Sequence, residues 1–370
     1  MKKSYLMIAA ALLAACAGND TVNDIETTET AISFDSFSSN VTKGAIEGND
    51  QAARKKSLSD AGGFVVYGYK TLTNLDNSTW SAINQTIFNG IHVYSDNNGS
   101  TWKYDRLRFW DKNGKYNFYA VAPYDPEDNA TYSIVSTIGN DFGKITIAGA
   151  TSKISSESDD YLIARTGALN ELGSNHTNSN NPTVNFAFHH VMAKVTFALK
   201  STLSTGKIQV TSLEMSGWNN ANGTFTQNTF VNPASIECSE WTLATPAVAG
   251  NAVLVGTGGD DAIDLTCATN ATATDLDTWY IMVPQAISAN TLKFKLTFTY
   301  TDDNGTANDT SDDYTETFTD QEATVELAQT WGTDSYTKYT IDVKPAEIKF
   351  DITSICNFDN NGGEKEVPLD

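Results

Sequence analysis

Positive charge is scarce in this sequence. Its 370 residues include 24 Lys and Arg against 45 Asp and Glu, which gives a formal net charge of −21 at pH 7. Because no basic patch is available to neutralise phosphates, we expect no nucleic-acid partner. The same charge repels anionic membrane surfaces, so we expect any membrane contact to come from an attached lipid.

The sequence also lacks the motifs of common enzyme and cofactor sites. It has no Gly-x-Ser-x-Gly elbow, no His-Glu-x-x-His pair, no phosphate-binding glycine loop and no dinucleotide fingerprint. His189 and His190 are neighbours on an expected strand and point to opposite faces, which argues against a shared metal. The acidic residues 302–313 lack the ligand order of an EF-hand, and Asn304-Gly305 is typical of a hairpin tip. We predict no catalysis, no cofactor and no metal, with calcium at residues 302–313 as the alternative.

Cysteine is rare, and one of the four cysteines has a clear context. Cys16 ends the run Leu13-Ala14-Ala15-Cys16, which follows Lys2-Lys3 and a short uncharged segment. This order is typical of a bacterial lipoprotein signal, in which Cys16 becomes the acylated first residue of the mature chain. The uncharged segment is too short to span about 30 Å of hydrocarbon as a helix. We predict export and lipidation at Cys16, with a plain secretory signal as the alternative.

Two of the remaining cysteines are candidates for a disulfide. An exported protein meets oxidising conditions, so Cys238 and Cys267 can form a bridge. The alternative is that both are buried and unpaired, as small apolar residues. No cysteine spacing resembles a zinc site.

Helical periodicity is absent beyond two turns, whereas strand patterns are frequent. Residues 292–300 alternate strictly between apolar and polar side chains, which indicates a strand with one buried face. Many short strands between polar turns predict β-sandwiches. The Asn- and Ser-rich stretch 172–182 is the expected boundary between two of them. We divide the chain into a signal (1–16), an acidic tether (17–30), a first β domain (31–182) and a second β domain (183–370).

Arginine is the rarer basic residue, with four in the sequence. Arg106, Arg108 and Arg165 lie near expected strands, whereas Arg54 lies in a long polar loop, residues 41–63, after the first expected strand. Exposed polar loops are preferred sites of proteolysis, so we predict processing at Arg54. The alternative is that Arg54 and the two lysines that follow it are only a solvated cluster of charge.

Several short motifs follow one another in a fixed order along the chain. They are Ile32-Ser33-Phe34 with a trailing Thr42-Lys43-Gly44, Phe64-Val65-Val66-Tyr67-Gly68-Tyr69, Phe109-Trp110, Tyr116-x-Phe118-Tyr119-Ala120, Asp160-Tyr161-Leu162-Ile163-Ala164, Val184-x-Phe186-x-Phe188-His189-His190, Trp331-Gly332, Tyr336-Thr337-Lys338-Tyr339-Thr340-Ile341 and Ile348-x-Phe350. Behind a lipoprotein signal, this order resembles the fimbrillin family of Bacteroidales, the subunits of type V pili, over nearly the whole mature chain. Cys356 departs from the pattern, because a tryptophan is expected near that position.

The resemblance implies an all-β chain with two tandem transthyretin-like β-sandwich domains. It also implies a precursor that reaches the outer membrane and cell surface as a lipoprotein and loses its N-terminal segment to an arginine-specific protease. Subunits of the family join other fimbrillin subunits, in homo- or heteropolymers, by strand exchange. Strand exchange is physically reasonable, because an incoming strand satisfies the unpaired backbone and the apolar groove that a departing strand leaves behind.

The resemblance assigns roles to particular residues. Cleavage after Arg54 would release Cys16 together with the placeholder strand, the strand that holds Ile32 and Phe34 and occupies the groove before assembly. The expected donor strand, which fills the groove of another subunit, is the extended segment with Ile348, Phe350 and Ile352 on one face.

The expected function is that of a structural fimbrial subunit, or a tip or accessory fimbrillin, which serves cell adhesion through a host or bacterial surface ligand. Two other classes stay open at this point. A surface glycan-binding lipoprotein of a nutrient-uptake system would show coplanar exposed aromatic side chains. A surface hydrolase would need a concave site with two facing carboxylates.

Overall fold

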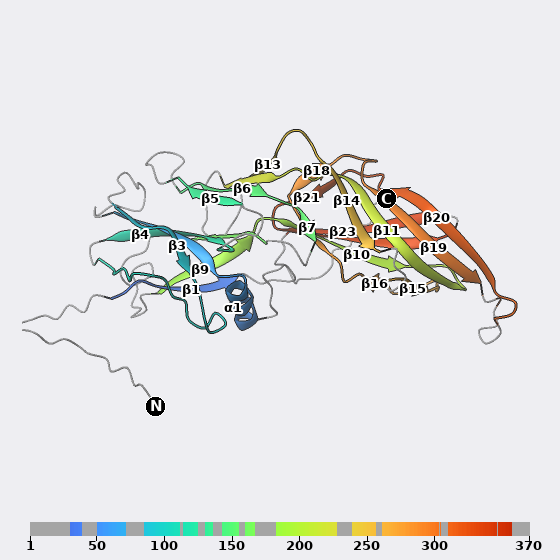
Figure 1. The fold of residues 1–370 in the computed structure, drawn as a ribbon, viewed down its shortest axis with the longest axis horizontal. Coiled ribbons are helices and arrows are strands. Elements are labelled where there is room, and N and C mark those ends of the chain that lie inside the picture. Colours follow the sequence, from blue (N-terminus) through green and yellow to red (C-terminus); the bar gives the residue numbers. More distant parts are fainter. Residues whose placement is uncertain are drawn as a thin grey trace, which may run out of the picture.

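The computed structural model describes residues 30–38, 50–71, 85–111, 114–124, 130–135, 143–154, 160–166, 183–227, 239–256, 261–302, 304, 310–345 and 347–356. Figure 1 shows an elongated arrangement of stacked β-sheets, with the N-terminal half on the left and the C-terminal half on the right. The helix α1 (Gln51–Asp60) is the only helix in these ranges. None of the described segments forms a helix long and apolar enough to cross a membrane. The all-β fold predicted from the sequence is confirmed.

The first sheet has six strands in the order β1-β9-β8-β4-β2-β3. Its strands are β1 (Ser33–Ser38), β2 (Phe64–Thr71), β3 (Gln85–Val93), β4 (Lys115–Ala122), β8 (Leu162–Arg165) and β9 (Thr183–His190). β1 lies at one edge and runs parallel to β9, whereas the other neighbours in this sheet are antiparallel. The central strand β4 is buried along nearly its whole length, because both faces of the sheet are covered.

Two layers cover this sheet. One face carries Phe64, Phe118 and Phe186 and packs against Leu58 of α1 and Trp102 in a cluster that we call the aromatic core. The other face packs against a four-stranded sheet in the order β13-β12-β6-β5. The strands of that second layer are β5 (Thr131–Ile134), β6 (Ile145–Ala150), β12 (Gly223–Gln227) and β13 (Ser239–Leu243).

The C-terminal half is a sandwich of two larger sheets, which can be followed on the right of Figure 1. The first contains β7 (Lys153–Ile154), β10 (Ala193–Lys200), β16 (Thr274–Asp275), β17 (Tyr280–Met282), β22 (Ser335–Lys344) and β23 (Glu347–Cys356). The second contains β11 (Lys207–Asn219), β14 (Ala249–Val255), β15 (Ile263–Thr266), β19 (Lys293–Asp302) and β20 (Tyr314–Thr324). A two-stranded sheet of β18 (Gln285–Ile287) and β21 (Gln329–Trp331) completes the half. Alternate residues such as Phe294, Leu296 and Phe298 are fully buried in the core between the sheets.

Each half of the chain contributes strands to sheets of the other half. β9 and β10 are separated by Val191 and Met192 alone, and both residues are fully buried. β12 of the second half pairs with β6, and the short β7 of the first half pairs with β17. The predicted boundary at residues 172–182 therefore separates strands that belong together, because β9 begins at Thr183 and pairs with β8 and β1. The polar stretch connects neighbouring strands of one sheet.

Candidate functional site: the first strand and its groove

The chain ahead of β1 is held against residues 108–110 by two backbone hydrogen bonds. The Ile32 N–H donates to the carbonyl of Arg108 at 2.8 Å, and the Trp110 N–H donates to the carbonyl of Thr30 at 2.9 Å. From Ser33 onward, β1 pairs with β9 in a parallel register that places Ser33 opposite Thr183. The Oγ atom of Ser33 lies 2.9 Å from Oγ1 of Thr183. β1 is therefore an added edge strand in a groove between β9 and residues 108–110.

Ile32, directly ahead of β1, and Phe34 of β1 complete the aromatic core. Ile32 is 1% exposed and Phe34 is 5% exposed. The Phe34 ring lies 5.2–5.8 Å, between centroids, from the rings of four aromatic residues. These are Phe88, Tyr104, Phe118 and Phe186. Removing β1 would expose this nest of rings, so the two predicted placeholder residues occupy the apolar slot that a placeholder requires.

The next inward residue of β1 after Phe34 is polar. Ser36 is 1% exposed, and its hydroxyl has no hydrogen-bond partner among the residues that the structure describes. A buried hydroxyl without a partner costs about 1–3 kcal/mol. β1 therefore fits the groove well at Ile32 and Phe34 and poorly at Ser36.

The helix α1 follows β1 and is tied to it. Lys55 of the helix and Asp35 of β1 form an ion pair with 2.5 Å between Nζ and Oδ1. Leu58 of the helix is buried in the aromatic core, and Ser59 donates a hydrogen bond to the carbonyl of Ser95 at 3.2 Å. The helix thus holds the outer face of β1 against the body of the protein.

The predicted processing residue, Arg54, lies in the first turn of α1, so the expected loop is wrong for residues 51–60. Asp50 caps the helix, because its Oδ1 accepts from the Ala53 N–H at 2.8 Å, and the Arg54 N–H donates to the Asp50 carbonyl at 3.1 Å. Such a cap is worth about 1 kcal/mol. A protease that takes its substrate extended has to unwind this first turn.

The predicted donor residues lie on β23, the other end strand of the fold. β23 forms the edge of its sheet and pairs antiparallel with β22. Ile348, Phe350 and Ile352 are half-buried against the core of the C-terminal half, and the Phe350 ring lies 5.1 Å from that of Phe294. On the opposite face, Asp351 forms an ion pair with Lys200 at 2.6 Å. The structure does not bring the donor and placeholder segments of one chain together.

Less can be said of the remaining predicted site residues. Cys16 and Cys238 lie outside the described residues, so lipidation and the disulfide stay predictions. Cys267 is a buried free cysteine with its Sγ 3.5 Å from Oγ of Ser201, and burial raises the pKa of its thiol. No group of three or more potential metal ligands occurs among the residues with a described placement.

A buried pair of polar side chains, His190 and Asp160, was not predicted from the sequence. His190 and Asp160 are both fully buried, and Nδ1 of His190 lies 2.8 Å and 2.9 Å from the two oxygens of Asp160. Next to it, burial and the neighbouring His190 lower the pKa of His189. The pair lies where β8 begins and β9 ends, so it belongs to the junction between the halves. Its residues are 30 positions apart, which leaves no local sequence signal.

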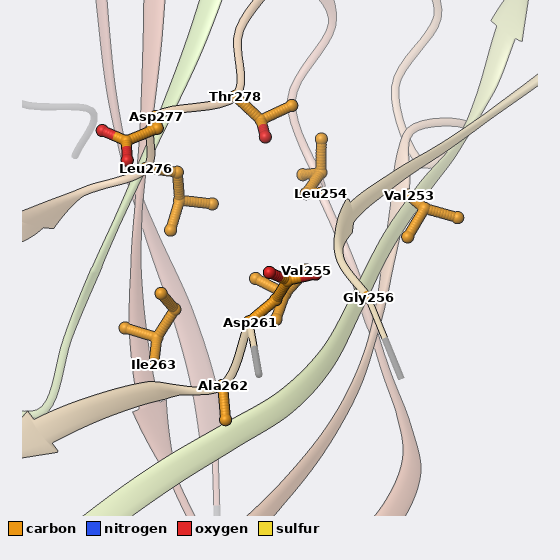
Figure 2. A pocket seen from close by; sticks show the side chains of 10 residues that line it. All are labelled: Val253, Leu254, Val255, Gly256, Asp261, Ala262, Ile263, Leu276, Asp277 and Thr278. Atoms are coloured by element: carbon orange, nitrogen blue, oxygen red, sulfur yellow. The ribbon is translucent and has the colours of Figure 1, made fainter. Parts of the chain in front are cut away.

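A pocket of about 500 Å³ opens between the end of β14 and the start of β15 (Figure 2). Its walls include Leu254, Val255 and Ile263, and the charged side chains among its described lining residues are Asp261 and Asp277. In Figure 2 the two carboxylates do not point toward one another. The described residues of this pocket therefore do not form the pair of facing carboxylates that a glycoside hydrolase needs.

The tryptophans are mostly core residues. Trp102, Trp110, Trp218 and Trp331 are buried, and Trp279 is half-buried beneath the Nζ of Lys194, 3.9 Å from its ring centroid. Packed indoles cannot serve as a flat surface for sugars. Trp110, Trp218 and Trp331 are therefore core residues.

The fold and the groove define a class of protein. It is an all-β protein in which β1, the first described strand, lies at the edge of its sheet and completes the aromatic core. A sequence model of the fimbrillin-like family matches residues 53–356, from the residue before Arg54 to the last residue of β23. The chain therefore belongs to the fimbrillin-like family. The family consists of fimbrial, non-enzymatic proteins, and membership implies a place in a fimbrium at the cell surface.

One solved structure supports the fold, and others match the chain with lower scores. A fimbrial protein from Bacteroides vulgatus is similar over 88% of this chain and 99% of its own, with 19% identity and a TM-score of 0.61. A candidate cell adhesion protein from Bacteroides uniformis covers 88% of this chain and 98% of its own, with 13% identity and a TM-score of 0.42. A tip fimbrial protein from Porphyromonas gingivalis covers 89% and 99%, with 10% identity and a TM-score of 0.36. The first score shows a shared fold. No curated protein sequence matches the chain.

Proposed function

We propose that this protein is a fimbrial subunit, exported as a lipoprotein and assembled by protease-triggered strand exchange. In this proposal β1 is the placeholder, cleavage at Arg54 frees it, and β23 of another subunit takes its place. The polymer serves cell adhesion. The observation that carries the proposal is the position of Phe34, which closes the aromatic core from a strand that has only one strand neighbour in its sheet.

Cleavage within α1 would change how β1 is held. Before cleavage, β1 is joined to the body through the chain that leads into α1. After cleavage, it is held only by its contacts, among them the β9 ladder, the ion pair of Asp35 with Lys55 and the two apolar side chains. Each of those side chains contributes about 1.5–3 kcal/mol when fully buried. An incoming strand that offers the same contacts can therefore displace β1 once the covalent link is cut.

The donor has to leave its own sheet. Ile348, Phe350 and Ile352 are half-buried in the subunit, so their release exposes less apolar surface than their burial in a groove like that of Ile32 and Phe34 would remove. The difference favours transfer. The edge position of β23 means that only the pairing with β22 has to break.

A disulfide lock tests the exchange directly. Replacing Ser33 and Thr183 by cysteine places two thiols on atoms that now lie 2.9 Å apart, which suits a disulfide. After treatment with an arginine-specific protease, the locked variant should remain monomeric, and a reducing agent should restore polymers that resist SDS. The single Ser33→Cys variant is the control and should polymerise with or without reductant. Polymers from the locked, oxidised variant would show that β1 does not leave.

Arginine variants test the trigger. Arg54→Ala should remain a monomer after protease treatment, because β1 stays joined to the body. Arg106→Ala is the matched control, since Arg106 is an exposed arginine in a bend with a φ of 59° and should not affect assembly. If Arg106→Ala rather than Arg54→Ala blocks polymers, the processing site is misassigned.

The lipid anchor is tested at Cys16. Cys16→Ser should abolish labelling with a radioactive or clickable fatty acid and release the protein from the outer membrane fraction. Labelling that persists in this variant would contradict the lipoprotein assignment and leave the strand-exchange proposal standing.

A further inference from the structure

β1 and β23 carry the same sequence pattern. Residues 32–38 read Ile-Ser-Phe-Asp-Ser-Phe-Ser, and residues 348–354 read Ile-Lys-Phe-Asp-Ile-Thr-Ser. The isoleucine, phenylalanine, aspartate and final serine coincide at the same spacing. Because side chains alternate along a strand, the isoleucine and phenylalanine share one face and the aspartate lies on the other in both segments.

We propose that β23 of a second copy enters the groove parallel to β9 and in the register that this match defines. Ile348 then takes the position of Ile32, and Phe350 takes that of Phe34 among the four aromatic rings. The inference rests on the proposed function. It adds the direction and register of the donor strand beside β9 and the reason why the donor binds the groove more tightly than β1. A parallel strand displaced by two residues would put Ile352 in the place of Phe34 and leave the ring nest unfilled.

The outer face of the two strands supports the same register. Asp35 pairs with Lys55 in the precursor, and Asp351 pairs with Lys200 in its own sheet. In the matched register Asp351 takes the position of Asp35. Lys55 directly follows Arg54, so it remains with the body after cleavage there and can accept the new carboxylate.

The two strands differ at the position that β1 fills poorly. The register places Ile352 where Ser36 now stands, buried and without a hydrogen-bond partner among the described residues. An isoleucine brings no polar atom into this site and adds apolar surface to be buried. Ser36 therefore makes β1 the weaker occupant. The subunit with β23 in its groove has a lower free energy than the subunit with β1 in its groove.

Interchain disulfides test the register. In the matched arrangement, residue 349 of the donor lies opposite Thr183 of the acceptor, where Ser33 lies now. Polymers of a Thr183→Cys, Lys349→Cys variant should contain the 183–349 linkage between copies, identified by mass spectrometry. A Thr183→Cys, Asp351→Cys variant reports a shift of two residues, because a 183–351 linkage forms only in that shifted register. Its polymers should lack the 183–351 linkage. Polymers with the second linkage and not the first would overturn the register but leave strand exchange intact, whereas a wild type that never polymerises would overturn both.

The role of Ser36 is tested by the rate of exchange. A peptide of residues 347–356 is added in excess to the protein cleaved at Arg54, and release of the fragment with β1 is followed by size-exclusion chromatography. Ser36→Ala removes the unpartnered hydroxyl without adding volume and should slow release by about fivefold or more. Ser33→Ala is the matched control, since it removes a hydroxyl that has a partner, and should release β1 as fast as the wild type or faster. A peptide with Ile352→Ser should displace β1 more slowly than the native peptide. Equal rates for Ser36→Ala and wild type would overturn the inference about the driving force.

Discussion

Phe34 offers the most direct test of the groove, through the variant Phe34→Ala. The ring is 5% exposed and has four aromatic neighbours within 5.8 Å. Truncation of a buried phenylalanine costs about 3–5 kcal/mol, and each ring pair adds about 0.5–1.5 kcal/mol beyond area burial. Because β1 is an edge strand and can shift inward, we expect the lower end, about 3 kcal/mol of unfolding free energy for the uncleaved precursor.

The assay is urea unfolding of the precursor followed by tryptophan fluorescence. Trp102 and Trp110 lie in the same aromatic core as Phe34 and report on it. Phe318→Ala is the matched control, because Phe318 also lies on an edge strand, is half-buried and has one ring partner, Phe298, at 4.9 Å. We expect it to cost about 1 kcal/mol. Equal losses in the two variants would refute the view that β1 closes the core.

Four further predictions concern the helix, the junction, a close approach and pH. Asp50→Ala removes the cap of α1 and about 1 kcal/mol, so cleavage at Arg54, followed by gel electrophoresis, should be about fivefold faster. Asp160→Ala removes the fully buried carboxylate that contacts His190 and should cost about 3–5 kcal/mol in chemical unfolding, with a smaller loss for Asp160→Asn, which keeps a hydrogen bond. Gly250→Ala places a Cβ 2.1 Å from the Trp218 ring and should cost about 1–3 kcal/mol, whereas Gly332→Ala, with 3.6 Å to the nearest atom, should be nearly neutral. Because the pKa of His189 is lowered in the folded state, the unfolded chain takes up its proton first, so stability should fall as pH drops below about 6.5; His189→Gln should flatten this part of the melting-temperature profile.

The strands with strict alternation could be predicted, because one buried face leaves a clear pattern. Residues 292–300 overlap β19, and the expected donor segment with Ile348, Phe350 and Ile352 lies within β23. The pairing of those strands could not be predicted. Parallel neighbours such as β1 and β9 or β10 and β22 show the same alternation as antiparallel ones, and partners far apart in the chain leave no local signal.

Local features were missed where packing does not shape the sequence. α1 buries only Leu58, so it has no apolar period, and its evidence was the cap residue Asp50 followed by good helix formers. The candidate site was found through the resemblance and through the apolar residues of β1 and β23. The mismatch at Ser36 could not be found in this way, because its meaning depends on burial and on the lack of a hydrogen-bond partner that only the fold reveals.

The direct passage from β9 to β10 has a mechanical consequence. If subunits join as proposed, tension enters one subunit through the strand in the groove beside β9 and leaves through β23. β9 continues through Val191 and Met192 into β10, which pairs in parallel with β22 over eight residue pairs. A pull along two parallel neighbours loads their hydrogen bonds together in shear, rather than one after another as in the peeling of a hairpin. The segment from residue 183 to residue 200 is therefore a short tensile element that can carry load between neighbours without drawing on the flanking sheets.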